Sequence, residues 1–399
     1  MIKNRDILVV GLQSYDISIG SNSVNLAREF SGQNRVLYVN YAPDRMTMIR
    51  GRRKDVIQKR LNIIKGLEPA LKQHSENLWV LNPAVVLEPI SKVRPGFLFD
   101  IINKRNALKF TAEVKNAIRE LDFKNFILFN DSDFYRSFYL KELLEPSVFV
   151  YYTRDNMIAT KFFRRYGEKY ESRLMAKADA VVANSEFLRD RAMQYNNNAF
   201  YVGQGCDLDF FSTKNVKPKP VDLSNIPSPL IGYVGTLTNS RLDIDLLSQI
   251  ARRNPSWNIV LVGPEDDHFR NSKLHNLENV HFTGRKDPEL LPTYIYYFDV
   301  AINPQKLNAL TIGNYPRKID EYLAMGKSVV ATKTEALCIF KDHVFLAGNA
   351  DEFIDKIREA ITQNSQEIAN KRMLFAQEHS WQNNVQRIYD VISDIESNY

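Results

Sequence analysis

Short apolar segments alternate with longer amphipathic segments along the whole chain, and this alternation constrains the fold more than any other feature. In the first half, residues 7–10 predict a buried strand, residues 23–30 the helix after it, and residues 36–40 the next strand. The same alternation starts afresh with an apolar segment at residues 230–234. Strands that alternate with helices favour parallel sheets covered by helices, so the sequence predicts an α/β fold with two doubly wound domains.

A proline-rich stretch separates the two alternating halves. Residues 214–229 contain four prolines and few apolar residues, which is typical of a linker or a domain entry. We therefore expect an N-terminal domain over 1–205, a linker over 206–229, a C-terminal domain over 230–380 and a last amphipathic helix over 381–399.

The composition excludes several classes of protein. Hydrophobic residues make up 44% of the chain and charged residues 25%, which argues against a largely disordered protein. No apolar run approaches the roughly 20 residues that a membrane-spanning helix needs. The two cysteines cannot build a disulfide framework, and no secretory leader is recognisable, so we expect a cytoplasmic protein.

Positive charge is concentrated in the N-terminal half. Residues 1–200 carry 32 Lys and Arg against 22 Asp and Glu, whereas residues 201–399 carry 21 against 25. Eight basic residues lie between positions 45 and 65 beside Met46, Met48 and Ile49, and such a mixture is attracted to anionic lipid. We expect this stretch to face the membrane through Arg50, Arg52, Arg53 and Lys54. A solvated helix face without a partner is the alternative.

A cluster near the end of the second half has the chemistry of a nucleotide site. Pro316 stands where a helix can begin, and Lys318 and Glu321 are three residues apart, so they share one face of its first turns. A cation beside helix amides suits a phosphate, and a carboxylate suits the paired hydroxyls of a ribose. By spacing alone, an ordinary surface ion pair would explain the same two residues.

The same cluster resembles the signature of GT-B glycosyltransferases of the GT4 type: a Glu, seven residues, a second Glu, and then Ala-Met-Ala-x-Gly-x-Pro-Val-Val. Glu321 and Gly326 match the second Glu and the Gly. The first Glu falls at Gly313, so recognition of the donor sugar does not carry over. Other segments of the family follow in order across residues 140–399, although Thr236 and Arg241 stand where the family has Arg and Lys.

The resemblance implies two Rossmann-like domains that face each other across a cleft, with the nucleotide on the second and the 381–399 helix crossing back to the first. It implies that Arg241 and Lys318 bind the diphosphate and that Glu321 binds the ribose. The donor residues expected on this basis are Gly235, Thr236, Arg241, Gly263, Pro264, Glu265, Pro316, Lys318 and Glu321.

The N-terminal half is similar to the membrane-associated glucuronosyltransferase of xanthan assembly, in the loop after the first strand and in the segment 151–156. This similarity implies that Asp155 is the catalytic base, with Asp16 as the second candidate. A carboxylate at the end of the 148–152 strand is placed to take a proton from an acceptor hydroxyl. The alternative is that Asp155 only caps the next helix. Ser18, Gly20 and Asn22 are expected to contact the acceptor.

Metal chemistry has weaker support in the sequence. Asp131-Ser132-Asp133 forms a DxD, a pattern that can hold a divalent metal on a nucleotide diphosphate. We interpret it as a cap or an acceptor contact and assign no metal, because the chain has the second Rossmann-like half that DxD-dependent GT-A enzymes lack.

Taken together, we expect a metal-independent glycosyltransferase without a cofactor, which uses a nucleotide-diphosphate sugar, in the first place a UDP-sugar. The expected acceptor is a saccharide or a lipid-linked saccharide of cell-envelope polysaccharide synthesis. The expected location is the inner face of the membrane, and no nucleic acid is expected as a partner. Two alternatives stay open: a GT-B-fold sugar-nucleotide epimerase, and a non-catalytic membrane or nucleic-acid binding protein on a decayed glycosyltransferase scaffold.

Overall fold

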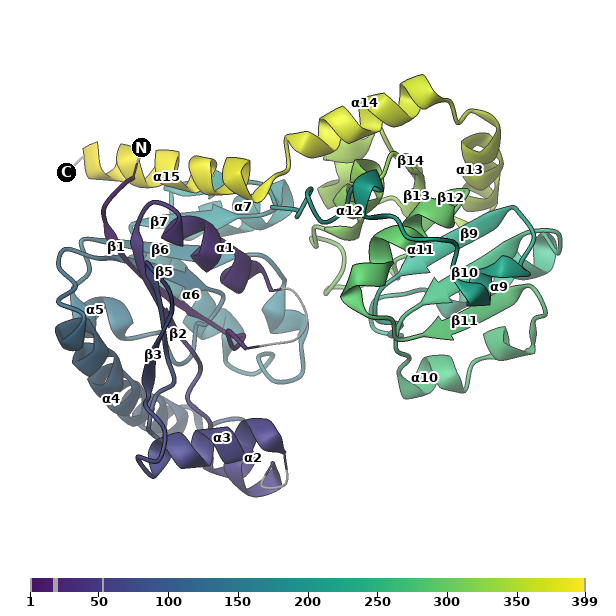
Figure 1. Cartoon of the computed structure of the whole chain (residues 1–399). Coiled ribbons are helices and arrows are strands. Elements are labelled where there is room, and N and C mark those ends of the chain that lie inside the picture. The colour runs from purple at the N-terminus through teal and green to yellow at the C-terminus, as the bar shows by residue number, and fades with distance from the viewer. Residues whose placement is uncertain (1, 17–20, 52–53, 398–399) are drawn as a thin grey trace. The chain divides into compact units, whose positions relative to one another are not determined.

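The computed structural model describes residues 2–16, 21–51 and 54–397 and divides the chain into two compact units (Figure 1). The first unit runs to Gly203 and takes up the chain again at Asn384, and the second unit comprises Gln204–Asn383. Ser18, Gly20, Arg52 and Arg53 lie outside the described residues.

The first unit is built on an eight-stranded sheet with the strand order β3-β4-β2-β1-β5-β6-β7-β8. All neighbouring strands are parallel except β3 and β4, which pair antiparallel at one edge. The strands are β1 (Asp6–Gly11), β2 (Arg35–Val39), β3 (Leu71–Ser75), β4 (Leu78–Leu81), β5 (Ile127–Asp131), β6 (Val148–Thr153), β7 (Ala180–Ala183) and β8 (Ala199–Tyr201).

Helices cover both faces of this sheet. The helices of the unit are α1 (Asn22–Ser31), α2 (Arg45–Arg50), α3 (Asp55–Ile64), α4 (Gly96–Glu120), α5 (Leu140–Leu144), α6 (Gly167–Lys177) and α7 (Glu186–Met193). Buried residues of α4, α5 and α6 share one core cluster with alternate residues of β1, β2 and β5. On the other face, Phe30 of α1 packs edge to face against Phe129 of β5, with ring centroids 5.2 Å apart.

The second unit is a six-stranded parallel sheet with the order β11-β10-β9-β12-β13-β14. Its strands are β9 (Leu230–Val234), β10 (Asn258–Val262), β11 (Val280–Gly284), β12 (Val300–Asn303), β13 (Ser328–Thr332) and β14 (Phe345–Ala347). Its helices are α8 (Val221–Ser224), α9 (Ile244–Arg253), α10 (Asp267–Arg270), α11 (Leu291–Tyr297), α12 (Lys318–Ala324), α13 (Ala350–Thr362) and α14 (Gln366–Gln377). α9 and α13 pack on one face and α11, α12 and α14 on the other.

The expected linker, residues 206–229, lies within the second unit. Phe211 and Leu223 are buried in the same core cluster as α11 and α12. Prolines here shape a segment that packs along the sheet, so proline content alone does not indicate a solvated linker.

The last helix, α15 (Trp381–Ser397), belongs to both units. It begins in the second unit and enters the first at Asn384. The side-chain amide of Asn384 donates to the carbonyls of Val202 and Gly203, at 2.8 and 3.0 Å. Within the described residues, no helix is both long and apolar enough to cross a membrane.

Candidate nucleotide and acceptor sites

Two glycine loops meet where β9 and β10 end. Gly235 and Gly263 have φ angles of +145° and +150°, which L side chains rarely adopt. A Cβ atom on Gly263 would lie 2.0 Å from the carbonyl oxygen of Gly235, so the two loops touch through backbone alone. The Gly235 amide also donates to the carbonyl of Val262 at 2.8 Å. These contacts hold the two loops together through their backbones at the carboxyl ends of the strands.

Lys318, the first residue of α12, extends over these loops. A Cβ atom on Gly235 would lie 2.2 Å from Lys318 Cε and 2.8 Å from its Nζ. The ammonium group also lies 5.6 Å from the centroid of the Tyr233 ring. No carboxylate among the described residues lies within ion-pairing distance of Lys318, so its charge is available to an anion on the glycine loops.

Glu321 lies on the same short helix but does not pair with Lys318. Its Oε1 accepts from Nε of Arg317 at 3.0 Å, and its side chain is only 9% exposed. The ion pair at this helix therefore joins Arg317 and Glu321, which are four residues apart. Arg317 was not among the predicted site residues. The pair holds the Glu321 carboxylate in place while its second oxygen keeps the capacity to accept from hydroxyl groups.

The loop after β10 contacts an aromatic stack through Glu265. Glu265 pairs with His275 at 2.8 Å, and His275 stacks on Phe282 with ring centroids 3.9 Å apart. Pro264 accepts from the amide of Leu237 at 2.8 Å, so this loop is tied to the loop that carries the exposed Thr236. Sequence reasoning missed His275, since an isolated histidine gives no signal of stacking.

Three further contacts involve Arg241, Pro316 and Asp320, the residue next to Glu321. Arg241 is half-buried, and its backbone carbonyl accepts from the amide of Lys306 at 2.8 Å. Behind the helix, the buried carboxylate of Asp320 pairs with Nδ1 of His379 at 2.7 Å. Burial raises the pKa of Asp320 above its ordinary value, although His379 opposes that change. Pro316 is buried two residues before Lys318, and its carbonyl accepts from the amide of Ile319 at 2.9 Å.

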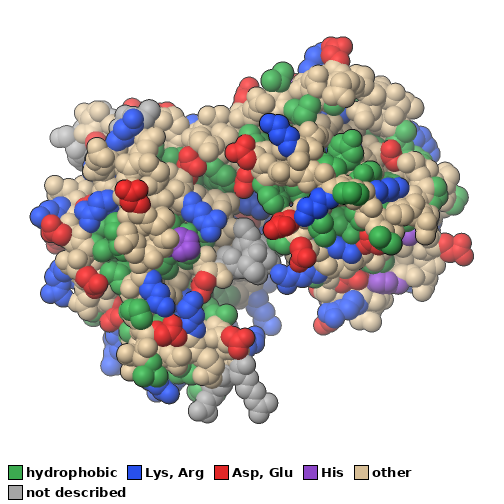
Figure 2. Space-filling model, in the orientation of Figure 1, with side chains coloured by type: hydrophobic (Ala, Val, Ile, Leu, Met, Phe, Trp, Pro, Cys, Tyr) green, Lys and Arg blue, Asp and Glu red, His purple; other side chains and the backbone are tan. Residues whose placement is uncertain are grey.

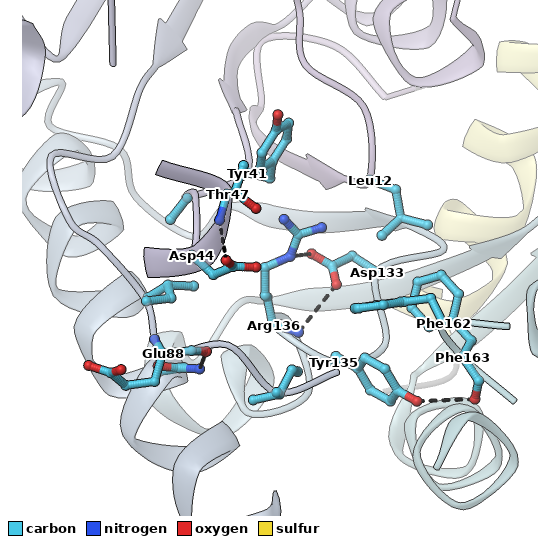
Figure 3. Close-up of a pocket in the computed structure, with 14 residues that line it drawn as sticks. Leu12, Tyr41, Asp44, Thr47, Glu88, Asp133, Tyr135, Arg136, Phe162 and Phe163 are labelled. Carbon is cyan, nitrogen blue, oxygen red and sulfur yellow. Dashed lines mark hydrogen bonds and ion pairs between the residues drawn. The ribbon is translucent and has the colours of Figure 1, made fainter. Parts of the chain in front are cut away.

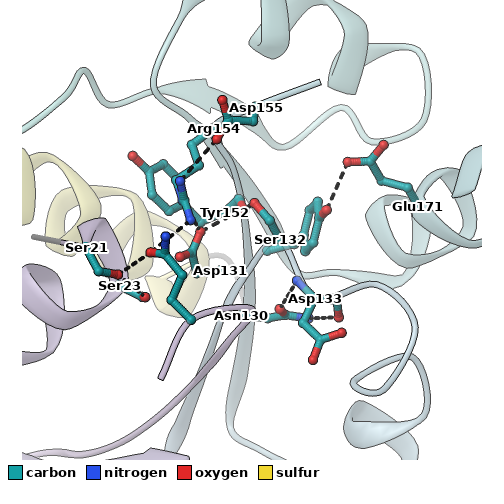
Figure 4. Close-up of polar contacts among 12 residues, drawn as sticks. Ser21, Ser23, Asn130, Asp131, Ser132, Asp133, Tyr152, Arg154, Asp155 and Glu171 are labelled. Atoms are coloured by element: carbon teal, nitrogen blue, oxygen red, sulfur yellow. Dashed lines mark hydrogen bonds and ion pairs between the residues drawn. The ribbon is translucent and has the colours of Figure 1, made fainter. Parts of the chain in front are cut away.

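In the first unit, charged side chains gather at the ends of β5 and β6 (Figure 4). Nε of Arg154 donates to Asp131 at 2.8 Å, and its Nη1 donates to Asp155 at 3.1 Å. Asp131 is fully buried. Burial alone would lower the pKa of Arg154, but the two carboxylates raise it above its ordinary value. Asp155, the first candidate base, is therefore held in an ion pair directly after β6.

Comparison with known proteins assigns the second unit. Residues 228–363 match the family model described as Glycosyl transferases group 1. These residues are a glycosyl transferases group 1 domain. The domain holds both glycine loops, Lys318 and Glu321, and extends from β9 to the end of α13.

A longer match reaches beyond this group 1 domain. The chain is 27% identical over 226 residues to TuaH of Bacillus subtilis (strain 168), a protein named for glycosyl transfer in teichuronic acid biosynthesis. The match covers 54% of this chain and 56% of TuaH, so the chain spans about half the length of this relative.

Solved structures similar to the whole chain show the fold. A structure of HepE from Anabaena in complex with UDP has a TM-score of 0.69 and 17% identity, covering 98% of this chain and 100% of HepE. A glycosyltransferase from Rickettsia africae has a TM-score of 0.64 and 16% identity, with full coverage of both chains. A UDP-forming trehalose-phosphate synthase from Burkholderia vietnamiensis reaches 0.70 at 11% identity, covering 99% of each. The expected GT-B fold is therefore confirmed.

The other predicted residues of the first unit are spread over several elements. Asp16 is exposed and pairs with Lys59 of α3 at 3.6 Å. Asn22 is the first residue of α1 and is half-buried. Arg50 ends α2, and Lys54 precedes α3; both are exposed. No group of three metal-ligating side chains occurs within the part of the chain that the structure describes.

Proposed function

We propose that the chain is a glycosyltransferase that moves a sugar from a nucleotide-diphosphate sugar to a hydroxyl group of a saccharide or a lipid-linked saccharide. The observation that carries this proposal is the Lys318 ammonium, which lies over two touching glycine loops inside a group 1 domain. UDP is the proposed leaving group, and the UDP complex of HepE supports it.

The donor would bind through charge and backbone. Lys318 and Arg241 would neutralise the diphosphate as the glycosidic bond to the sugar breaks, which is the electrostatic part of catalysis. Glu321 would accept from the ribose hydroxyls, and residues 263–265 would lie near the base. Gly313 is buried where the family has its first Glu, so selection of the donor sugar must rest on other residues.

Asp155 is the proposed base for the acceptor hydroxyl, with Asp16 as the second candidate. The position of Asp155 supports this role, because Arg154 holds its carboxylate directly after β6, and a carboxylate within hydrogen-bond reach of a hydroxyl group can take its proton. Asp155→Asn should lower UDP release from a UDP-sugar at least about 100-fold and leave UDP affinity unchanged. Near-normal release, together with a loss in Asp16→Asn, would move the role to Asp16. Normal release in both variants would support a retaining reaction in which the donor phosphate takes the proton.

Cell-envelope polysaccharide synthesis at the inner face of the membrane is the proposed setting. The name of TuaH supports an envelope polymer. Figure 2 shows basic, apolar and acidic side chains among one another on the part of the first unit where α2 and α3 lie. The exposed Ile49 and Arg50 of α2 support a peripheral membrane location.

The first experiment is a thermal-shift screen of UDP, GDP, ADP, TDP and CMP on the purified protein. A ligand that binds only the native state raises the melting temperature according to its affinity and concentration. We expect UDP to stabilise the protein and Lys318→Ala to weaken UDP binding at least about tenfold, since a charge-assisted contact is lost. Lys341→Ala, which removes an exposed lysine of the same unit, is the control. Stabilisation by none of the five would favour the non-catalytic binding protein.

A further inference from the structure

A cavity in the first unit belongs to none of the donor contacts described above. It has a volume of about 170 Å³ and lies beside the loops that follow β1, β2 and β5 (Figure 3). Leu12, Tyr41 and Asp133 contribute from these loops, and Thr47 of α2 closes one side. Enclosed sites for drug-sized ligands span ~300–1,000 Å³, so this cavity has room for one small ring and not for an oligosaccharide.

Four of the fourteen residues that line the cavity are aromatic. Tyr41, Tyr135, Phe162 and Phe163 all line it. The hydroxyl of Tyr135 donates to the carbonyl of Phe163 at 3.1 Å, which fixes both residues. Phe162 is 49% exposed, so part of its ring is accessible to a ligand.

The inner end of the cavity is polar and charged. Oδ2 of Asp133 accepts from Nε of Arg136 at 3.0 Å, and these side chains are only 4% and 19% exposed. The Arg136 guanidinium lies 5.3 Å from the centroid of the Tyr41 ring. A carboxylate has about four acceptor positions and a guanidinium five donors, so this pair retains unused hydrogen-bonding capacity.

The turn after β5 explains why Asp133 faces the cavity. Ser132 has a φ angle of +60°, and the Asn130 side chain bonds both the amide and the carbonyl of Asp133. This geometry directs Asp131 to Arg154 and Asp133 to Arg136, so the two carboxylates of the DxD serve two different places (Figures 3 and 4).

We propose that this cavity binds one neutral pyranose ring of the acceptor, which stacks on Phe162 while its hydroxyls bond Asp133 and Arg136. The assignment rests on the proposed glycosyltransferase function. A sugar offers an apolar ring face and several hydroxyls, and these match the aromatic residues and the polar end. An alkyl chain would remove water from the Asp133–Arg136 pair without replacing its hydrogen bonds. A phosphate would meet three carboxylates, those of Asp44, Glu88 and Asp133, against one paired arginine.

Titration of the full chain with methyl β-glucoside, methyl β-galactoside and methyl N-acetyl-β-glucosaminide, followed by saturation-transfer NMR, tests the proposal. We expect at least one glycoside to bind and Phe162→Ala to weaken that binding about tenfold. Asp133→Asn should weaken it as well. Phe97→Ala is the matched control, because it removes an aromatic ring that is 67% exposed and lies outside the cavity. UDP affinity should be unchanged in all three variants.

Several outcomes would overturn the assignment. These are binding of none of the three glycosides, glycoside binding that Phe162→Ala leaves unchanged, or binding of decyl phosphate alone that depends on Phe162. A parallel measurement of UDP binding distinguishes a failure of the cavity assignment from a failure of the proposed function. A protein that binds UDP through Lys318 and ignores the glycosides contradicts only the cavity assignment, whereas loss of UDP binding with retained glycoside binding contradicts only the donor site.

Discussion

At the scale of single residues, the two proposed donor loops depend on Gly235 and Gly263, which have no side chains. Gly263 has no side chain because the carbonyl of Gly235 occupies the place where its Cβ atom would lie. Two constraints therefore act together at this position: a φ angle of +150° and a backbone contact that cannot give way.

Gly263→Ala tests both constraints together, and comparison with a glycine that has only the positive φ angle isolates the effect of the backbone contact. The overlap and the unfavourable φ angle should lower the free energy of unfolding by about 3 kcal/mol or more. Gly284→Ala is the matched control, since Gly284 has a φ angle of +70° with nothing within 4 Å of the added Cβ. It should cost only about 1 kcal/mol. Urea unfolding measures both, and equal losses would contradict the role of the backbone contact.

Lys327 is a second residue whose surroundings have a measurable consequence. Its Nζ donates to the carbonyls of Tyr296 and Phe298, and burial lowers its pKa to about 8. Between about pH 8 and 10.5 the unfolded chain binds more protons at this lysine than the folded chain, so its contribution to stability rises with pH.

Lys327→Met should remove that pH dependence. The stability of the natural protein relative to the variant should therefore increase between pH 8 and pH 10, measured as the difference in the free energy of unfolding in urea. An equal difference at both pH values would show that the ammonium is not disfavoured in the folded state.

At the scale of elements, α2 is a short helix with an unusual surface. Asp44 caps it by accepting from the amide of Thr47 at 2.7 Å, and only Met48 of its six residues is buried. Ile49 is 56% exposed, and Arg50 follows it at the end of the helix. An exposed apolar side chain beside a cation is favourable at an anionic lipid surface.

The double variant Ile49→Asp, Arg50→Glu should reduce binding to phosphatidylglycerol vesicles at least about tenfold, because apolar burial and cation attraction are both lost. Vesicle co-sedimentation at low salt measures this. Lys371→Glu with Leu374→Asp makes the same changes on α14, where Leu374 is 62% exposed, and should leave binding unchanged. Equal binding by all three proteins would exclude α2 as the membrane contact.

At the scale of the whole molecule, α15 connects the two units. Its part from Asn384 onward is buried in the first unit through Ile388, Tyr389 and Ile392. The hydroxyl of Tyr389 accepts from the side-chain amide of Asn34 at 2.8 Å. The first unit is therefore completed by the end of the chain, after the whole second unit.

Truncation before Asn384 should destabilise the first unit far more than the second. Hydrogen exchange should rise in β1, β2 and α1, while β9, β10 and α12 keep their protection. Uniform loss of protection would instead show that both units depend equally on this segment.

The sequence by itself determined the architecture, because a parallel sheet buries its strands on both faces and so leaves continuous apolar segments in the chain. The strands from β9 to β13 and the two doubly wound α/β domains were predictable in this way, and the resemblance to GT-B glycosyltransferases then implied the GT-B fold. β3 was not, since it is an antiparallel edge strand with the mostly polar sequence Leu-Lys-Gln-His-Ser. The first half of α4 also gives no clear signal in the sequence, because its apolar residues Phe97 and Ile101 are exposed and do not mark a buried face.

For the sites, the sequence determined which residues stand at the ends of strands, and only the tertiary structure decided their partners. Lys318 could be recognised from its motif, but its position over Gly235 depends on how α12 packs on β9. The sequence likewise could not assign Asp131 to Arg154 and Asp133 to Arg136. The physical reason is that hydrogen bonds and ion pairs depend on distances of a few tenths of an ångström between segments far apart in the chain, and packing alone sets those distances.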